Sequence, residues 1–454
     1  MTRRLTAADV REGLAPLALA SQGSFDKQPV DFAIDSRELQ QGQGFIALKG
    51  EEVDGNDYVG DALANGAAIV VCECDPPQGV TAVKVRDSRQ ALAALAGWWR
   101  QELGTRAVGV TGSVGKTTTK EITADVLQSR APVLRNQANW NTDIGVPLTL
   151  LRLTSDHRWA VLEMAMRGAG QIRQLARIAQ PAVGVVTNVG QVHAELLGSV
   201  DAIAWAKSEL IQELPEDGLA VLNAEDPRVS AMDKKARCPV TRYGFRSSAD
   251  VRAAEIQTDG LDGLAFRLEA GEERQPVRLK LPGRHNALNA TAAAAVAIGE
   301  GFSLMEIAAA LEKVEPYRLR QVSGPNGSLI LDDTYNASPA SMRAALDLLR
   351  EVPGRHVAVI GDMRELGQYE EDAHADVGVY AAERAEVIVG VGEKAKAIVD
   401  AAREAGHPAA HAYLSKSDAV EDLRKNLKAG DVVLVKASRA LELETVVSAL
   451  EEKP

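Results

Sequence analysis

The sequence predicts an α/β protein of three domains, and two observations indicate this fold class. Apolar runs typical of buried strands alternate with helical segments along most of the chain, which is the pattern of parallel sheets covered by helices. The chain of 454 residues is also long enough to bury several separate cores. We expect a small mixed α/β domain over 1–85, a central parallel-sheet domain over 86–313, and a C-terminal Rossmann-like domain over 314–454.

The first region begins with a helix signal, because Thr6 can cap a helix that carries Asp9 in its first turn. A longer helix over 88–103 should lead out of this region. Between these two helices we expect strands at 32–35, 44–48, 69–72 and 82–85, with a further helix at 58–65.

The other two regions alternate strands and helices. In the middle region, strands should end at Thr111, Glu163 and Asn188, with another at 221–222 and short β-like segments inserted between 240 and 281. From about 314 the alternation restarts and predicts a second open sheet. Its strands are expected at 328–333, 356–361, 387–391, 411–414 and 432–436.

The segment from Val108 to Lys120 reads Val-Gly-Val-Thr-Gly-Ser-Val-Gly-Lys-Thr-Thr-Thr-Lys. A strand feeds a glycine-rich turn and then a helix, so backbone N–H groups and the helix dipole can converge on a phosphate. Lys116 should reach the outer phosphates, and the Thr117 hydroxyl should bind Mg²⁺. The motif Gly112-x-x-Gly115-Lys-Thr is tighter than the usual P-loop. It still predicts a nucleoside triphosphate site rather than an ordinary strand–turn–helix.

Polar residues close two of the apolar strands. Glu163 ends the run that begins at Trp159, where a parallel sheet presents groups to a ligand, and this makes it a candidate Mg²⁺ ligand. Asn188 ends another strand, and His193 follows in a loop. A polar strand end and an exposed loop histidine are the plain alternatives, but the place of His193 beside a strand end favours a ligand role.

Lys207 interrupts an apolar helical stripe. The segment 199–214 predicts a helix with Ser199 as N-cap and Asp201 in its first turn, and Lys207 falls in mid-helix on the inward face. A charged ammonium there would be costly. The side chain could extend to the surface, pair with the phosphate site, or be used chemically as a neutral amine.

Composition limits the class of protein. The net charge of −12 argues against nucleic-acid binding, although backbone N–H groups can still bind anions locally. Cys72, Cys74 and Cys238 are expected to be free thiols in a reducing compartment. Neither a signal-peptide core nor a run of about 18 apolar residues is found in the sequence. We therefore expect a cytoplasmic protein that does not insert into membranes.

The phosphate loop, Glu163, Asn188, His193 and Lys207 together resemble the Mur ligases of peptidoglycan synthesis. These are three-domain, ATP-dependent amide-bond synthetases, and the resemblance covers essentially the whole chain. It implies a UDP-substrate domain, a central ATPase domain and a C-terminal ligase domain. Further segments that carry it are Asp35-Ser36-Arg37, Asn139-Trp-Asn141-Thr-Asp-Ile-Gly, Gly283-Arg-His-Asn286-Ala-Leu-Asn289, Asp332-Asp333-Thr-Tyr335-Asn336, Gly361-Asp-Met-Arg-Glu-Leu-Gly367 and Lys436-Ala-Ser-Arg439.

The resemblance also implies the site residues. Catalytic roles fall to Lys116, His193, Lys207 and Arg318. Metal ligands would be Thr117, Glu163 and His193, for a first and a second Mg²⁺, and Lys207 would carry a CO₂-derived carbamate. ATP would be bound by Gly112, Ser113, Val114, Gly115, Lys116, Thr117, Thr118, Asn289, Arg318 and Asp333, and the substrate by Ser36, Arg37, Asn139, Asn141, Tyr335 and Asn336.

Within the family, the C-terminal segments resemble the branch that adds D-Ala-D-Ala to UDP-MurNAc-tripeptide through an acyl phosphate. This branch implies small-molecule substrates, a monomer, and a role in cell wall biogenesis, cell shape and cell division. The chain departs from the family at Thr142, where a second adjacent Asn is usual, at Tyr317, where Gly is usual, and at Ala437, another Gly position. The Asp-Asn-Pro-Arg motif of the diaminopimelate-adding (MurE-like) branch is missing from the C-terminal domain. A sister ligase, including a folylpolyglutamate synthetase, and a regulatory P-loop NTPase remain the alternatives.

Overall fold

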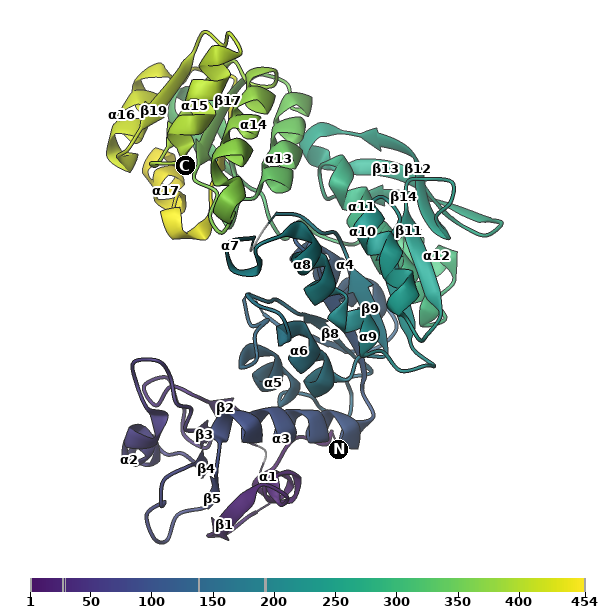
Figure 1. Ribbon diagram of the computed structural model, residues 1–454, viewed down its shortest axis with the longest axis vertical. Coiled ribbons are helices and arrows are strands. Elements are labelled where there is room, and N and C mark those ends of the chain that lie inside the picture. The colour runs from purple at the N-terminus through teal and green to yellow at the C-terminus, as the bar shows by residue number, and fades with distance from the viewer. Residues whose placement is uncertain (1, 27, 29, 138, 192–193, 453–454) are drawn as a thin grey trace.

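The computed structural model describes residues 2–26, 28, 30–137, 139–191 and 194–452. Within these ranges the chain forms three sheets, which follow one another along the long axis of the molecule (Figure 1). The N-terminal sheet lies at one end and the C-terminal sheet at the other, and the central sheet joins them. The predicted α/β class is confirmed by this arrangement.

The first sheet runs in the order β1(Ala18–Gln22), β5(Ala82–Val85), β4(Ile69–Cys72), β3(Gly44–Ile46), β2(Phe32–Ala33). Its strands are parallel except for β1, which pairs with β5 in the antiparallel sense. Thr6 and Asp9 form the capping box of α1(Ala7–Leu14), and α2(Val59–Ala64) lies where a helix was expected. The sequence did not predict β1, because this edge strand is largely exposed and lacks an alternating apolar pattern.

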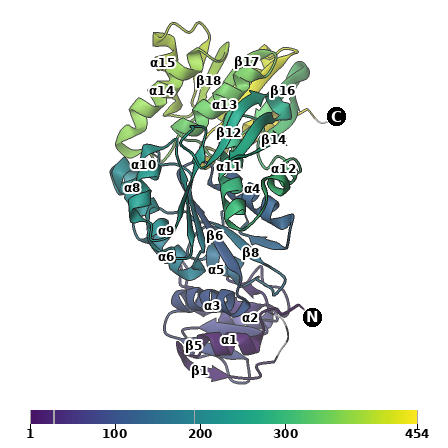
Figure 2. The same cartoon turned by 90° about the vertical axis from the view of Figure 1, so that its right-hand side faces the viewer.

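Helix α3(Ser88–Leu103) has the predicted bounds. Asp87 caps its first turn, and Gly104 ends it with a φ of +64°. Its apolar side, including Leu92 and Trp99, belongs to one buried cluster with residues of the first sheet and of the central unit. The helix therefore lies between the two units (Figure 2), and the predicted boundary at 85/86 stays a prediction.

The central sheet carries the phosphate-loop strand in its interior. Strands β6 to β12 are parallel to one another. An antiparallel hairpin of β13 and β14 extends one edge, so the β-like segments expected at 240–281 continue this same sheet. The order is β14(Glu273–Leu279), β13(Leu264–Ala270), β12(Val251–Thr258), β11(Val240–Gly244), β10(Leu219–Asn223), β9(Val183–Val186), β6(Arg106–Thr111), β8(Trp159–Glu163), β7(Val133–Arg135).

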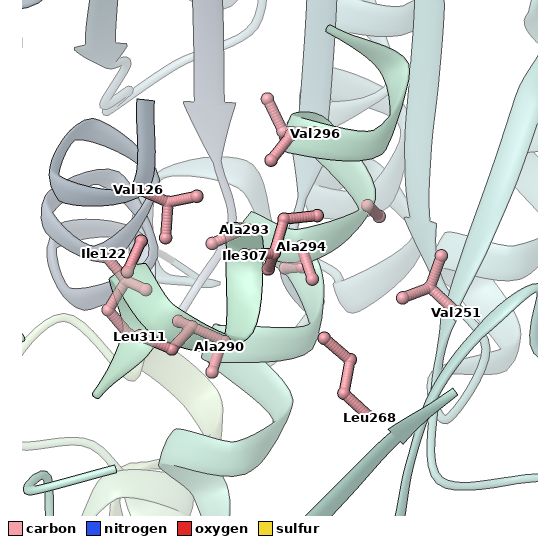
Figure 3. Packing of buried hydrophobic residues seen from close by; sticks show 14 of the residues in the cluster. Ile122, Val126, Val251, Leu268, Ala290, Ala293, Ala294, Val296, Ile307 and Leu311 are labelled. Carbon is pink, nitrogen blue, oxygen red and sulfur yellow. The ribbon is translucent and has the colours of Figure 1, made fainter. Parts of the chain in front are cut away.

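Helices cover both faces of this sheet. One face packs against α4(Lys116–Gln128), α11(Arg284–Gly299) and α12(Leu304–Leu311). Figure 3 shows how the short side chains of Ala290 and Ala293 on α11 leave room for Ile122 and Val126 of α4. The other helices of the unit are α5(Gly145–Leu150), α6(Gln171–Ala179), α7(Ala194–Leu197), α8(Val200–Lys207), α9(Glu209–Gln212) and α10(Pro227–Ser230).

The C-terminal sheet follows the order β15(Arg320–Gly324), β16(Ser328–Asp332), β20(Asp431–Lys436), β17(Arg355–Gly361), β18(Val387–Val391), β19(Ala410–Tyr413). The five strands predicted here are confirmed to within a residue or two, and β15 was missed because this antiparallel edge is short, polar and mostly exposed. Helices α13(Pro339–Glu351), α14(Glu370–Ala382) and α15(Ala395–Glu404) pack on one face, and α16(Lys416–Asn426) and α17(Glu444–Leu450) on the other.

The prediction of a single helix over 199–214 is wrong in one respect. Ser199 caps α8 as predicted, but α8 ends at Lys207 and α9 begins at Glu209. The Ser208 hydroxyl donates to the carbonyl oxygen of Trp205 at 2.6 Å and competes with the backbone for it. Lys207 is therefore the last residue of α8 rather than a mid-helix residue.

Two expectations from composition concern the whole chain. The three cysteines carry free thiols, as expected. Among the described residues, no helix combines the length and the hydropathy needed to cross a membrane.

Candidate active site

The turn between β6 and α4 is held in place by the end of β9. The Thr187 hydroxyl donates to the carbonyl oxygen of Val114 at 2.7 Å, and the Asn188 side chain both accepts from the Val114 N–H and donates to its carbonyl. Gly112 has a φ of +150°, and a Cβ there would lie 1.8 Å from the Thr187 hydroxyl. The turn therefore requires glycine at this position.

Gly115 is the N-cap of α4, with a φ of +82°, and a Cβ there would lie 2.8 Å from Oδ1 of Asn289. Asn289 accepts from the Thr119 hydroxyl and donates to Asn286, so α11 supports the turn from behind. No side chain of the described residues caps the N-terminus of α4. Its first N–H groups are thus available to an anion, as the sequence predicted.

Lys116 folds back over the turn and donates from Nζ to the carbonyl oxygen of Ser113 at 3.2 Å. Burial lowers the pKa of its ammonium below the ordinary value, the charge of Glu163 opposes this shift, and the charge of Arg318 adds to it. A phosphate group would replace part of the lost solvation. The position therefore suits a lysine that binds an anion.

Glu163 joins three of the predicted site residues. Its buried carboxylate accepts from the Thr117 hydroxyl at 2.7 Å on one oxygen and from Nδ2 of Asn141 at 2.9 Å on the other. Arg318, from the C-terminal unit, donates to the Thr117 hydroxyl at 2.9 Å. The structure thus brings Thr117, Asn141, Glu163 and Arg318 together, whereas Asn139 lies exposed on the same turn.

The oxygen donors of Thr117 and Glu163 fit Mg²⁺, which favours hard ligands and commonly keeps only one or two protein groups beside waters and substrate phosphates. In the described part of the chain, no three His, Cys, Asp or Glu side chains gather as a metal cluster. His193 lies outside the described residues. Its predicted role as a metal ligand therefore stays a prediction.

Lys207 is buried, with 1% of its surface exposed. Its pKa lies well below the ordinary value, because burial disfavours the charged form and the nearby positive charge of Lys116 adds to the effect. Within the described ranges, its amine has neither a hydrogen bond nor an ion pair. These facts favour a buried neutral amine over an ammonium group that extends to the surface.

A cavity of about 250 Å³ lies between the central and C-terminal units. On one side it borders the phosphate turn through Val114, Gly115 and Thr118, and α11 contributes Asn289. The C-terminal unit contributes Asp333, whose carboxylate pairs at 2.6 Å with the buried ammonium of Lys436. Six of the ten sequence-predicted nucleotide residues, drawn from both units, therefore line one cavity: Val114, Gly115, Thr118, Asn289, Arg318 and Asp333.

The predicted substrate residues Ser36 and Arg37 belong to the N-terminal unit and lie apart from this cluster. Arg37 pairs with Asp35 at 2.6 Å, remains exposed, and lowers the pKa of that carboxyl to about 2 through its hydrogen bonds. Ser36 is buried beside it, in the loop after β2. Tyr335 and Asn336, in the loop before α13, instead adjoin the cluster: the Arg318 guanidinium lies 4.2 Å from the ring centroid of Tyr335, and Nζ of Lys436 donates to the carbonyl oxygen of Asn336 at 2.8 Å.

The sequence reasoning missed two buried polar groups beside the site. Asn136 follows β7 and bonds to the backbone of Glu163, and Lys120 donates to the carbonyl oxygen of Asn136. The position of Asn136 directly after a strand was a signal that could have found it. Glu209, two residues after Lys207, accepts from the N–H groups of Gly170 and Arg173 and thereby caps α6.

Family models match three stretches of the chain. The model described as Mur ligase family, catalytic domain, matches residues 32–99, and the Mur ligase middle domain matches 110–297. The model described as Mur ligase, glutamate ligase domain, matches 317–439.

Full-length relatives point to one branch. The UDP-N-acetylmuramoyl-tripeptide–D-alanyl-D-alanine ligase of Bacillus subtilis (strain 168) is 36% identical over 431 residues, which cover 93% of this chain and 93% of the relative. The ligase of the same name from Escherichia coli (strain K12) is 37% identical, with 92% and 93% covered.

Solved structures agree with these relatives. MurF from Acinetobacter baumannii superimposes with a TM-score of 0.88 at 31% identity, covering 99% of each chain. MurF ligase from Thermotoga maritima, in complex with ADP, gives 0.81 at 30% identity, covering 92% of this chain and 96% of that one. The predicted three-domain architecture is thereby confirmed. The chain belongs to the Mur ligase family and, within it, to the UDP-N-acetylmuramoyl-tripeptide–D-alanyl-D-alanine ligases (MurF).

Proposed function

We propose that this protein uses ATP to join D-Ala-D-Ala to UDP-MurNAc-tripeptide. The observation that carries the proposal is the contact of Thr117 with both Glu163 and Arg318, which places a phosphate turn, a carboxylate and a guanidinium from three segments at one point. The names of the full-length relatives support the choice of substrates. The reaction would serve peptidoglycan synthesis in the cytoplasm, and through the cell wall it would serve cell shape and division.

The first step is phosphoryl transfer. A carboxylate oxygen of the tripeptide attacks the γ-phosphorus of ATP, the bond to the β-phosphate oxygen breaks, and ADP leaves with that electron pair. Lys116 and Arg318 face the phosphates and offset the charge that accumulates on them. The product is an acyl phosphate, whose carbonyl carbon is open to attack by an amine.

The second step forms the amide. The free amine of D-Ala-D-Ala attacks the acyl carbon, a tetrahedral intermediate forms, and phosphate leaves as the amine loses a proton. Because joining a carboxylate to an amine in water is uphill, the protein must exclude water and align both partners. We assign substrate contacts to Ser36, Arg37, Asn139, Asn141, Tyr335 and Asn336, so closure of the proposed domains 1–85, 86–313 and 314–454 would assemble the site.

Thr117 and Glu163 are the proposed ligands of a first Mg²⁺, with His193 beside a second, and these ions would neutralise phosphate charge. Asn289, Arg318 and Asp333 would hold the adenosine and its phosphates from the cavity between the units. Lys207 is proposed to carry a carbamate, since a buried neutral amine can react with CO₂ and release one proton. The protein is proposed to act as a monomer.

The test is phosphate release from ATP with each UDP-muramyl peptide, with and without D-Ala-D-Ala, followed by mass spectrometry of the product. We expect release that depends on both UDP-MurNAc-tripeptide and D-Ala-D-Ala. Free diaminopimelate, L-alanine or glutamate as the preferred amine would instead indicate a sister ligase. Release without any amine acceptor would indicate a regulatory NTPase.

A further inference from the structure

Asn136 is a fully buried amide at the carboxyl end of β7. It stands where the regular pairing of β7 with β8 stops, after Arg135 opposite Val161. A buried amide must find partners for its donors and its acceptor, and each bond that it makes restricts the groups around it.

The side chain of Asn136 hydrogen-bonds to both backbone polar groups of Glu163. Its Oδ1 accepts from the Glu163 N–H at 2.9 Å, and its Nδ2 donates to the Glu163 carbonyl oxygen at 3.0 Å. The amide thus acts as a further rung of the ladder between β7 and β8. Asn136 therefore holds Glu163, the last residue of β8, on the side that faces β7, where no residue of β7 pairs with it.

The same Nδ2 also donates to the carbonyl oxygen of Trp140 at 2.8 Å. Trp140 precedes Asn141, whose amide donates to a carboxylate oxygen of Glu163 at 2.9 Å. Asn136 therefore restrains both the backbone of Glu163 and the turn that supplies a partner to its carboxylate.

Lys120 anchors Asn136 from the neighbouring helix. Its side chain is fully buried, and Nζ donates to the carbonyl oxygen of Asn136 at 2.6 Å and pairs with Glu121 at 2.7 Å. Lys120 lies on α4, the helix that also presents Thr117 to the Glu163 carboxylate. One helix thus holds the carboxylate directly and holds the group that orients it.

We propose that Asn136, anchored by Lys120, is a positioning residue that sets the Glu163 carboxylate for a divalent cation. The inference rests on the proposed function, which makes Glu163 a metal ligand. Groups that orient a metal ligand commonly change metal affinity about 10–100-fold when removed, and we expect a change of that order here.

The test measures metal affinity in two ways. For Asn136→Ala we expect the Mg²⁺ concentration at half-maximal phosphate release to rise about tenfold, with kcat at saturating Mg²⁺ falling much less. The affinity for Mn²⁺, followed by its electron paramagnetic resonance signal in the presence of ADP, should fall by a similar factor without turnover.

Asn223 provides a matched control. It is also a buried amide at a strand end, where it donates to the carbonyl oxygen of Thr187 at 2.7 Å and accepts from the Glu225 N–H. Asn223→Ala should lower Tm to a comparable degree but leave Mn²⁺ affinity within about twofold, since it touches no proposed metal ligand.

A double-mutant cycle shows whether Asn136 acts through Glu163. Glu163→Ala alone should weaken Mn²⁺ binding, and adding Asn136→Ala should weaken it no further. Unchanged Mn²⁺ affinity in a folded Asn136→Ala protein, or full additivity with Glu163→Ala, would overturn the inference. If Asn136→Ala does not fold, Lys120→Met replaces it in the test. A Mn²⁺ affinity in Lys120→Met equal to that of the wild-type protein would overturn the proposed anchoring of Asn136 by Lys120.

Failure of the proposed function would look different. In that case the wild-type protein would show no release dependent on D-Ala-D-Ala, or Glu163→Ala would leave Mn²⁺ affinity unchanged. If the wild-type protein passes both tests, the Asn136→Ala results test the positioning role of Asn136 alone.

Discussion

Nη2 of Arg318 lies 2.9 Å from the hydroxyl oxygen of Thr117, although 201 residues separate them in the chain. The guanidinium also lies 4.2 Å from the ring centroid of Tyr335. The segment that enters the C-terminal unit therefore touches the phosphate turn directly. Any movement between the two units must change this contact.

Arg318→Ala should raise KM for ATP about tenfold or more and also lower kcat, because it removes a positive charge from the phosphate end of the cavity. Steady-state kinetics over a range of ATP concentrations would measure both. Arg320→Ala is the matched control, since that neighbour instead faces Asp332 at 3.4 Å. Equal kinetic effects of the two substitutions would contradict the assignment of Arg318.

Lys116→Ala should lower kcat by about 10²–10³ or more, because the charge facing the migrating phosphoryl group is lost. The fold should survive, since among the described residues the lysine ammonium donates to one backbone group, the carbonyl oxygen of Ser113. Circular dichroism and Tm would establish folding, and phosphate release would measure the rate. Near-normal ligation by the folded variant would contradict the phosphate-loop assignment.

Lys207→Met should stabilise the protein in CO₂-free buffer, most strongly at low pH. The pKa of Lys207 is lowered well below 10.5 in the folded state. Between the lowered and the ordinary pKa, the unfolded chain binds a proton that the folded chain does not. The stability of the parent therefore rises with pH through this window and is lost as pH falls through it.

The Tm difference between Lys207→Met and the parent should thus shrink from pH 6.5 to pH 9.5, as measured by calorimetry. Lys425→Met serves as a control, because Lys425 is exposed and its pKa is raised by Glu421. A difference that grows with pH would refute the burial argument.

Lys207→Ala should nearly abolish ligation while ATP binding, measured by calorimetric titration, stays largely intact. Added formate or acetate should restore part of the activity, because either anion can replace the missing carbamate oxygens. In a liganded crystal, density for a bare amine that points to solvent at neutral pH and ambient CO₂ would reject the carbamate.

Tyr317→Phe should cost about 1–2 kcal/mol of stability and raise KM for ATP, since the hydroxyl bonds to Asp125 on α4 and the ring lines the cavity. Tyr380→Phe is the matched control, because its hydroxyl donates to Asp347 at 2.7 Å within the C-terminal unit. It should lose stability but keep KM for ATP. If KM for ATP instead rose in Tyr380→Phe and not in Tyr317→Phe, the contact of Tyr317 with Asp125 would not position the residues that bind the nucleotide.

Local sequence patterns predicted much of the fold. The helix expected over 88–103 matches α3 to the residue, and its ends at the caps Asp87 and Gly104 show why: caps and periodicity act within a few residues. The edge strands β1 and β15 were missed, since one exposed face and unpaired polar groups leave no alternating pattern. The break at Ser208 depends on a side chain that competes for a carbonyl, which periodicity does not reveal.

By itself, the sequence determined the phosphate turn, the acid at the end of β8 and the out-of-place lysine at 207. Each of these follows from residue type and spacing along a short segment. Tertiary structure decided which groups meet: Arg318 on Thr117, Asn141 on Glu163, and the Lys120–Asn136 pair behind them. Such contacts join segments up to 201 residues apart. They form only when the packing of sheets and helices closes the loops between those segments, and local pattern does not encode this.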